Sequence, residues 1–377
     1  MSRRDINRAD LGSRARLAAD RLTRVQQDSG YFLYKFHPFN GEVKPGPGNL
    51  VRQAGCAYAV GRAADAAGES ERRIELAASA SRAIDALLCR LVIEGSGAFI
   101  AELPRPCSPV RGKLGTLALS LAAMQSASLA AKYRTERRLL VESILSSQRS
   151  DGSFRCLTDS LAVSDDGTRQ DYFPGEALMA ISFEMREGCE RAQYAMATAF
   201  PWYLSRFRAQ PTIAFVSWQV EAWRRYSEWA MGVASASMPD ARASSAFVYE
   251  MADWLMRLQI ESAPWNPNVI GGYSQVGWKP GVSSACCTEA MIGAFSLATQ
   301  LGDSRRASHY RRASLMGLNF MRRLQVIPQN LDLFPDPIRT LGGTIASLDD
   351  QTIRCDYDQH ALTAYLSAIE TSGLLAN

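Results

Sequence analysis

The sequence contains few histidines and lysines, and its cysteines lack the spacing of a zinc site. Only three histidines and five lysines occur in 377 residues, and the eight cysteines never form a C-x-x-C pair. We therefore expect no metal and no cofactor. We expect most of the cysteines to be small core residues, in a protein of a reducing compartment. A thiol role stays open for those near predicted turns, which are Cys107, Cys156 and Cys355.

The chain also lacks a large excess of charge, a long apolar run and a readable secretory signal. Its formal net charge is only +4, and the arginines are spread along helical segments. Binding to nucleic acid is therefore not expected. The longest apolar stretch, from Leu114, is interrupted by Thr, Ser and Gln, so it predicts a buried helix and no membrane span. We expect a protein of the cytoplasm.

A repeat is present along the whole chain. Amphipathic stretches end in an Arg/Leu/Gln-rich turn, run into a short Gly-aromatic segment such as DGSF at 151–154, and are followed by a helix rich in small residues. The hairpin points recur every 55 to 71 residues, at Gly30, Gly97, Gly152, Pro211, Gly272 and Gly343. Each unit has room for two helices and their connections.

The two helices of a unit differ in character. The first is amphipathic, as at 71–91, which is typical of an outer helix with one wet face. The second is rich in Ala, Gly, Ser and Cys, which suits an inner ring, and the six copies are 49–64, 114–131, 174–185, 217–229, 284–298 and 356–370. Six of each predict an all-α (α/α)6 toroid of six helical hairpins with short Gly-aromatic β-hairpin turns, forming a single domain over 1–377. An open solenoid of helix pairs is the alternative.

In such a toroid the N-termini of all inner helices meet at one end, and polar residues concentrate there. The candidates for substrate binding are Asn49, Arg52, Lys113, Asp171, Tyr172, Trp218, Glu221, Arg354 and Tyr357. Capping of a helix is an equally simple explanation for Asp171. Arg52 and Lys113 are harder to explain in this way, because a cation is disfavoured at a helix N-terminus and needs an anionic partner, either a carboxylate or a substrate.

The candidates for catalysis are Asp356, Glu176, His360, Asp358 and Glu289. Asp356 and His360 are four residues apart and share a helix face, so they form either a structural contact or an acid/base pair. A glycosidase needs two carboxylates, and Asp356 with Glu176 is the favoured pair because both open inner helices. Aromatic side chains at the same end suit the apolar faces of a sugar.

The Gly-aromatic hairpins, the inner helices NLVRQAG, KLGTLAL, DYFPGEAL and SWQVEA, and the closing IRCDYDQHALTAYL together resemble the six-hairpin glycosidase-like superfamily, in particular its bacterial members associated with polysaccharides. The segment 356–360 is also loosely similar to the end of the glucuronyl epimerases. That resemblance implies that Arg52, Lys113 and Arg354 would suit a substrate carboxylate, and that Tyr357 or His360 would transfer a proton. The related N-acylglucosamine epimerases use two histidines, for which His309 and His360 are the late-chain candidates.

These observations predict a carbohydrate-active enzyme, either a hydrolase or a lyase or epimerase, that acts on a sugar or a uronic-acid-containing glycan by carboxylate acid/base catalysis. One alternative is an enzyme like the terpene cyclases, because Gln26-x3-Gly30-x-Phe32 and Gln148-x3-Gly152-x-Phe154 match their Q-x3-G-x-aromatic turn. The protonating D-x-D-D motif is lacking, and 356–359 is its nearest approach. The other alternative is a glycan-binding toroid without chemistry.

Overall fold

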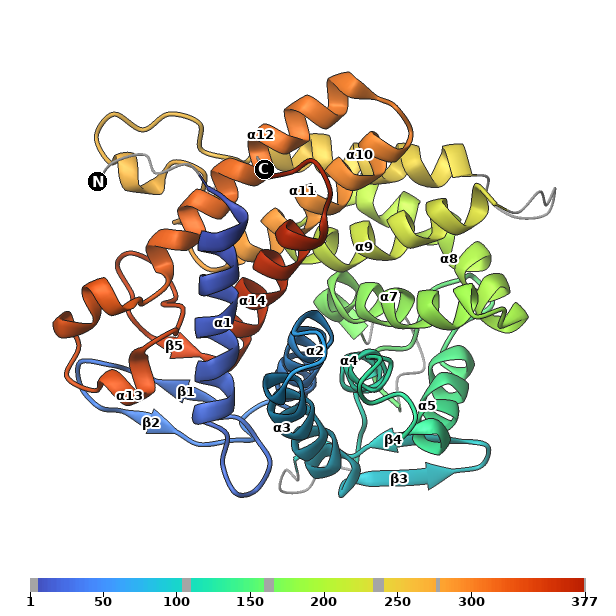
Figure 1. Cartoon of the computed structure of the whole chain (residues 1–377). Coiled ribbons are helices and arrows are strands. Elements are labelled where there is room, and N and C mark those ends of the chain that lie inside the picture. Colours follow the sequence, from blue (N-terminus) through green and yellow to red (C-terminus); the bar gives the residue numbers. More distant parts are fainter. Residues whose placement is uncertain (1–5, 104–109, 159–165, 233–240, 276–278, 376–377) are drawn as a thin grey trace.

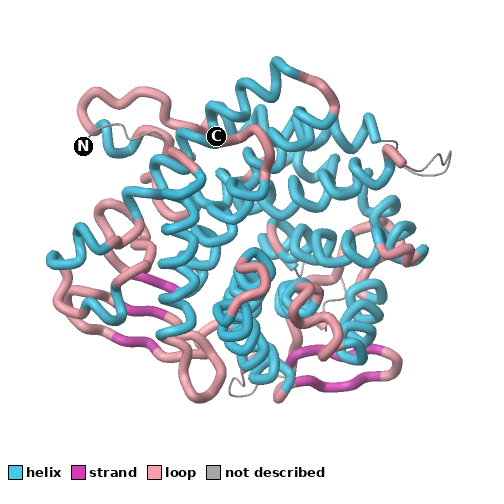
Figure 2. Tube along the Cα trace, in the orientation of Figure 1, coloured by secondary structure: helices cyan, strands magenta, loops and turns pink. Residues whose placement is uncertain are grey.

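The computed structural model describes residues 6–103, 110–158, 166–232, 241–275 and 279–375. Helices wind around a common centre, and the few strands lie in two small groups at the periphery (Figures 1 and 2). The inner helices are α2 (Leu50–Ala66), α4 (Leu114–Met124), α7 (Phe173–Arg186), α9 (Ile213–Ala230), α11 (Ser283–Gln300) and α14 (Cys355–Glu370). The outer helices are α1 (Arg8–Arg24), α3 (Glu71–Leu88), α5 (Arg134–Ser146), α8 (Glu190–Ala209), α10 (Ala241–Met256) and α12 (Ser304–Leu324).

The inner helices form a closed ring. Each one packs against the next along the chain, and α14 packs against α2, so the last inner helix completes the circle with the first. α1 packs against α14 in the same way that the other outer helices cover their own inner partners. The predicted (α/α)6 toroid is therefore confirmed, and the open solenoid is wrong. Close packing of the inner helices buries every residue of α4, and the small side chains in this helix allow its neighbours to approach closely.

Strands are confined to the connections. A three-stranded antiparallel sheet has the order β2 (Val43–Lys44), β1 (Lys35–Phe36) and β5 (Ile353–Arg354), so it joins the first hairpin to the start of the last inner helix. The second unit carries the hairpin β3 (Leu91–Glu94) and β4 (Gly97–Ile100). Short connecting helices lie at Gly167–Asp171, Pro267–Val269, Pro328–Leu333 and α13 (Pro337–Thr340). Among the described residues, none of the helices combines the length and apolar character that crossing a membrane requires.

A glutamine and a glycine explain why the hairpins recur. Gln148 lies two residues beyond the end of α5 and donates hydrogen bonds to the carbonyls of Gly152 and of Ala195 in the next outer helix. Gly152 has a φ of +90°, and a Cβ at this position would lie well inside 3.0 Å of the Thr198 carbonyl, three residues beyond Ala195. Only glycine fits this turn, because it needs both a positive φ and a close approach of two backbones.

The same device appears in four of the six units. The glutamines Gln26, Gln148, Gln259 and Gln325 bond the carbonyls of Ser79, Ala195, Ala313 and Arg14, and the glycines Gly30, Gly152, Gly271 and Gly342 approach the carbonyls of Arg82, Thr198, Met316 and Leu17. The fourth pair ties the end of α12 back to α1 and so closes the ring. In the last two units the glycine with positive φ comes one residue before the predicted Gly272 and Gly343. The helix from Leu114 also ends earlier than expected, at Met124.

Candidate active site

The inner helices direct a regular stripe of side chains toward the axis of the ring. In α9 the stripe consists of Trp218, Glu221, Arg225 and Glu228, which are spaced three and four residues apart and are partly exposed, whereas the residues between them on the other faces are largely buried. Neighbouring helices and α10 cover those other faces, so the exposure marks the axial side. The matching residues are Cys286, Glu289, Ser296 and Gln300 in α11, and His360, Thr363, Ser367 and Glu370 in α14.

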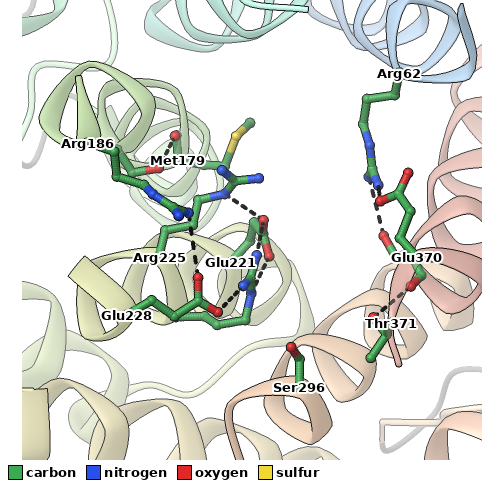
Figure 3. Close-up of polar contacts among 12 residues, drawn as sticks. Arg62, Met179, Arg186, Glu221, Arg225, Glu228, Ser296, Glu370 and Thr371 are labelled. Carbon is green, nitrogen blue, oxygen red and sulfur yellow. Dashed lines mark hydrogen bonds and ion pairs between the residues drawn. The ribbon is translucent and has the colours of Figure 1, made fainter. Parts of the chain in front are cut away.

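Glu176, Met179 and Arg186 of α7, and Tyr58 and Arg62 of α2, follow the same spacing of three, four or seven residues, and Arg52 lies in the first turn of α2. Figure 3 shows the deeper members of these stripes facing one another across an open centre. We call the space lined by these stripes the axial hollow. We name its end at the N-termini of the inner helices the mouth, and its end at their C-termini the deep end.

His360 lies one turn below the mouth and is surrounded by α11 and α9. Its Nδ1 is 3.7 Å from Oε2 of Glu289, and Thr363 donates a hydrogen bond to the other oxygen of that carboxylate. Cys286 lies within hydrogen-bonding reach of the ring, and the ring centroid is 6.0 Å from that of Trp218. Burial alone would lower the pKa of His360, but Cys286 and Glu289 hold the pKa well above its usual value.

Glu176 on α7 is a buried carboxyl group that lacks the usual partners. The residue is 5% exposed, and Oε2 has no hydrogen-bond partner. It packs against Gly115 of α4, where a Cβ would collide with this oxygen. Burial raises the pKa of Glu176 to about 8, and the charge of His360 opposes this shift. A carboxyl with a pKa near neutrality can both take up and release a proton.

Glu289 lies beside His360, whereas the acidic groups deeper in the hollow are neutralised by arginines. Burial alone would raise the pKa of Glu221, but Arg224 and Arg225 outweigh it and hold the pKa well below its usual range. Glu228 binds Arg224 and lies 3.6 Å from Arg186, while Arg62 donates to Glu370 at 2.6 Å (Figure 3). Arg225 also lies 4.0 Å above the ring of Phe183. The deep end therefore carries two groups of paired charges, one from α7 and α9 and the other from α2 and α14.

At the mouth, Asp356 is shared by two guanidinium groups. Arg354 binds both its oxygens, at 2.5 and 2.9 Å, and Nε of Arg52 approaches Oδ2 at 3.1 Å. The ring of Tyr357 lies 4.3 Å below Arg354. Asp356 and His360 lie on one face of α14, as expected, but they do not contact each other. The carboxylate beside His360 is Glu289, on another helix.

The remaining predicted residues have structural partners. Asn49 caps α2, and Lys113 binds Glu102 at 2.7 Å, so the cation near the start of α4 finds its anionic partner within the protein. Asp171 binds Arg206 of α8, and the N-cap of α7 is the following residue, Tyr172, so the capping explanation for Asp171 is wrong.

Asp358 is buried and pairs with Arg21 of α1, on the outer side of α14. A spacing of two residues turns Asp358 away from the face that carries Asp356. Burial raises the pKa of Asp358 to about 6 against the charge of Arg21, so this carboxyl is not the strong acid that alkene protonation would require.

Sequence reasoning missed Cys286, Tyr58 and Thr363. Their common signal is the spacing of the axial stripe, which depends on knowing which face of each helix points inward. The thiols considered from the sequence lie elsewhere: Cys156 and Cys355 are buried, and Cys107 lies outside the described residues. Burial also raises the pKa of Cys156 far above its usual value. His309 is exposed on α12, so His360 is the only late-chain histidine in the hollow.

A second concavity lies on the outer surface. A groove of about 840 Å³ between α10 and the start of α12 is lined by Tyr249, Asp253 and Arg306, among others. Two of its charged groups already have partners outside the groove, since Asp253 accepts a hydrogen bond from Tyr310 and Arg306 binds Asp303. The axial hollow is the better candidate, because it holds an unpaired carboxyl beside a histidine. Among the described residues, no cluster of three or more His, Cys, Asp or Glu side chains suits a metal ion.

Comparison with known proteins identifies the fold. No protein-family model matches the chain, and no curated protein matches it. A D-mannose isomerase superposes with a TM-score of 0.65 at 14% identity, over 96% of this chain and 97% of that one. A sugar epimerase from a ruminal bacterium superposes with a TM-score of 0.63 at 11% identity, over 97% of this chain and 99% of that one. A type II terpene cyclase from Scytonema superposes with a TM-score of 0.53 at 11% identity, also over 97% of this chain and 99% of that one.

The chain therefore has the (α/α)6 toroid fold of the six-hairpin glycosidase-like enzymes. The fold alone does not determine the chemistry, because sugar isomerases and a terpene cyclase share it. The reaction has to be argued from the side chains of the axial hollow.

Proposed function

We propose that the chain is a carbohydrate-active enzyme that isomerises or epimerises a sugar by moving a proton at carbon, with Glu176 and His360 as its acid/base groups. The observation that carries the proposal is the unpaired, buried carboxyl of Glu176 in the electrostatic field of His360. Two sugar-converting enzymes with the same fold support it.

The chemistry requires one group that removes a proton and one that stabilises the resulting oxygen anion. Glu176 in its ionised form takes the proton from the carbon beside the sugar carbonyl, and the electrons of that bond form a carbon–carbon double bond. His360, kept protonated by Glu289 and Cys286, gives its proton to the carbonyl oxygen. Return of the proton from Glu176 to the former carbonyl carbon, with loss of the hydroxyl proton of the adjacent carbon to His360, gives the isomer. Addition of a solvent proton to the opposite face of the original carbon gives the epimer, because the enol hydroxyl then returns its proton to His360 and Glu176 releases its proton to solvent.

The ring of Trp218 offers a stacking surface next to His360, and Tyr58 lies beside it with a centroid distance of 6.4 Å. Aromatic rings suit the apolar face of a sugar. These two residues would hold the substrate while the acid/base groups act.

Glycoside hydrolysis is the second candidate, because Glu176, Glu221 and Glu289 all lie along the hollow and Glu176 has the raised pKa of a general acid. It is less favoured because Arg224 and Arg225 neutralise Glu221, and Arg52 and Arg354 neutralise Asp356. A carboxylate bound by two guanidinium groups is a weak base and a weak nucleophile.

Solvent exchange separates the candidates. Mannose, glucose, cellobiose and glucuronate are incubated with the protein in D2O and followed by NMR. Loss of the carbon-bound hydrogen at C2 is expected, and Glu176→Gln or His360→Asn should slow it at least about 100-fold. His309→Asn, on the outer surface, is the matched control and should not change the rate. Release of reducing ends without exchange would favour the hydrolase, and sugar binding with neither reaction would favour a non-catalytic toroid.

A further inference from the structure

A row of cations crosses the small sheet at the mouth of the hollow. In the antiparallel register, Lys35 is opposite Lys44 on one side and opposite Arg354 on the other. Residues directly opposite each other project from the same face of a sheet, and like charges in such positions are destabilising. The fold therefore places three positive charges where a nearby anion would stabilise them.

Arg52 adds a fourth cation beside this row. It binds Asp356 together with Arg354, and it donates a hydrogen bond to the hydroxyl of Tyr34, whose ring lies 5.6 Å from Nζ of Lys44. Among the described residues, Asp356 pairs with two members of this group, and the hydrogen bonds from Thr352, together with the positive charge of Lys35, lower the pKa of Asp350. Four cations against two carboxylates leave the mouth positive. We call Lys35, Lys44, Arg52 and Arg354 the mouth cluster.

Two helix N-termini strengthen this positive field. Arg52 lies in the first turn of α2, and Arg354 is the N-cap residue of α14. Arg354 provides no side-chain cap, so the first N–H groups of α14 have no capping side chain. The positive ends of the α2 and α14 dipoles thus lie beside Arg52 and Arg354. A helix dipole disfavours a cation at this end and favours an anion. Both arginines remain accessible, with 32% and 24% of their side chains exposed.

We propose that the mouth cluster is a subsite for the anionic group, a carboxylate or a sulfate, of an acidic sugar. This inference rests on the proposed function, and it names the class of substrate for that site. Asp356 and His360 are four residues apart on α14, which is about 6 Å along the axis. A sugar whose charged group contacts Arg52 and Arg354 would therefore place its ring at the level of His360 and Trp218.

The direct test is binding measured by calorimetry, which does not depend on turnover. Glucuronate, glucose 6-sulfate and glucose are titrated into the full chain at low salt. At least one anionic sugar should bind tenfold or more tightly than glucose, and the comparison of the two acids shows which charged group is preferred. Because charge-assisted hydrogen bonds are lost, Arg52→Gln should weaken binding of the preferred acid about tenfold and leave binding of glucose unchanged, so that most of the preference disappears. The double variant Lys35→Gln/Lys44→Gln, on the sheet face, should reduce it about threefold to tenfold.

Lys132→Gln is the matched control, because it removes one exposed positive charge beside Asp85, far from the mouth. It should leave the preference unchanged. Equal affinity for glucose and the acids, failure of both acids to bind, or a preference that survives Arg52→Gln would overturn the subsite. Absence of deuterium exchange would instead count against the proposed function, so the two failures are distinguishable.

Discussion

Replacing Glu176 by glutamine should make the protein more stable at high pH while it removes activity. Glu176 is buried without a hydrogen bond on Oε2, and its pKa is raised by burial from 4.5 to about 8. Between these pH values the unfolded chain loses the proton and the folded chain keeps it, so the folded state binds more protons and stability falls as pH rises. The shift corresponds to about 5 kcal/mol, fully expressed above pH 8 and absent below about pH 4.5.

A neutral glutamine removes this pH-dependent cost. Its own amide will lack partners, which costs about 1–3 kcal/mol, but this penalty does not vary with pH. The stability of Glu176→Gln relative to the native protein should therefore rise by several kcal/mol from pH 5 to pH 8.5. Urea unfolding followed by circular dichroism at several pH values measures this difference.

Glu142→Gln is the control, because the hydrogen bond from Arg191 lowers the pKa of that partly exposed carboxyl. Removal of Glu142 should bring no gain in stability at high pH. The reasoning about Glu176 is refuted if its advantage is the same at every pH, or if it shrinks as the pH rises.

Three further results are expected. Gly152→Ala should lower the free energy of unfolding by about 3 kcal/mol or more, because a positive φ and a collision with the Thr198 carbonyl both oppose a Cβ. Gly188→Ala is the control, since Gly188 has a similar φ of +93° but open space around it, and its loss should be about 1–2 kcal/mol. Equal losses for the two variants in thermal or urea unfolding would contradict the role of this turn. Trp218→Ala should raise KM for the sugar by about tenfold with a smaller effect on kcat, as expected for a stacking surface, and an unchanged KM would exclude it. A bound sugar should slow alkylation of Cys286 by iodoacetamide, measured by mass spectrometry, and leave the exposed Cys89 unaffected; equal protection of both, or of neither, would argue against binding in the hollow.

The fold could be predicted largely because its signals are local. A glutamine, a positive-φ glycine and an aromatic residue fall within one short turn at 26–32 and again at 148–154, and small residues mark the helices that must pack on both sides. Closure of the ring followed from the count of six units. The exact hairpin residue was less certain, since Gly271 and Gly342 come one position before the glycines chosen from the pattern.

The site was harder to predict, because its pairings join helices far apart in the sequence. Helical spacing correctly places Asp356 and His360 on one face, yet the partner of His360 is Glu289 and the partners of Asp356 are Arg52 and Arg354. Asp358 looked equivalent to Asp356 in the sequence, but it belongs to the contact with α1. Which face of each inner helix points to the axis depends on packing, and this is why Cys286 was missed.

The most direct test of the account is a crystal structure of the His360→Asn variant with a sugar bound. The sugar ring should lie in the axial hollow against Trp218, with the carboxyl of Glu176 within hydrogen-bonding distance of its C1–C2 region. A sugar bound only in the outer groove between α10 and α12, with the axial hollow free of it, would contradict the account.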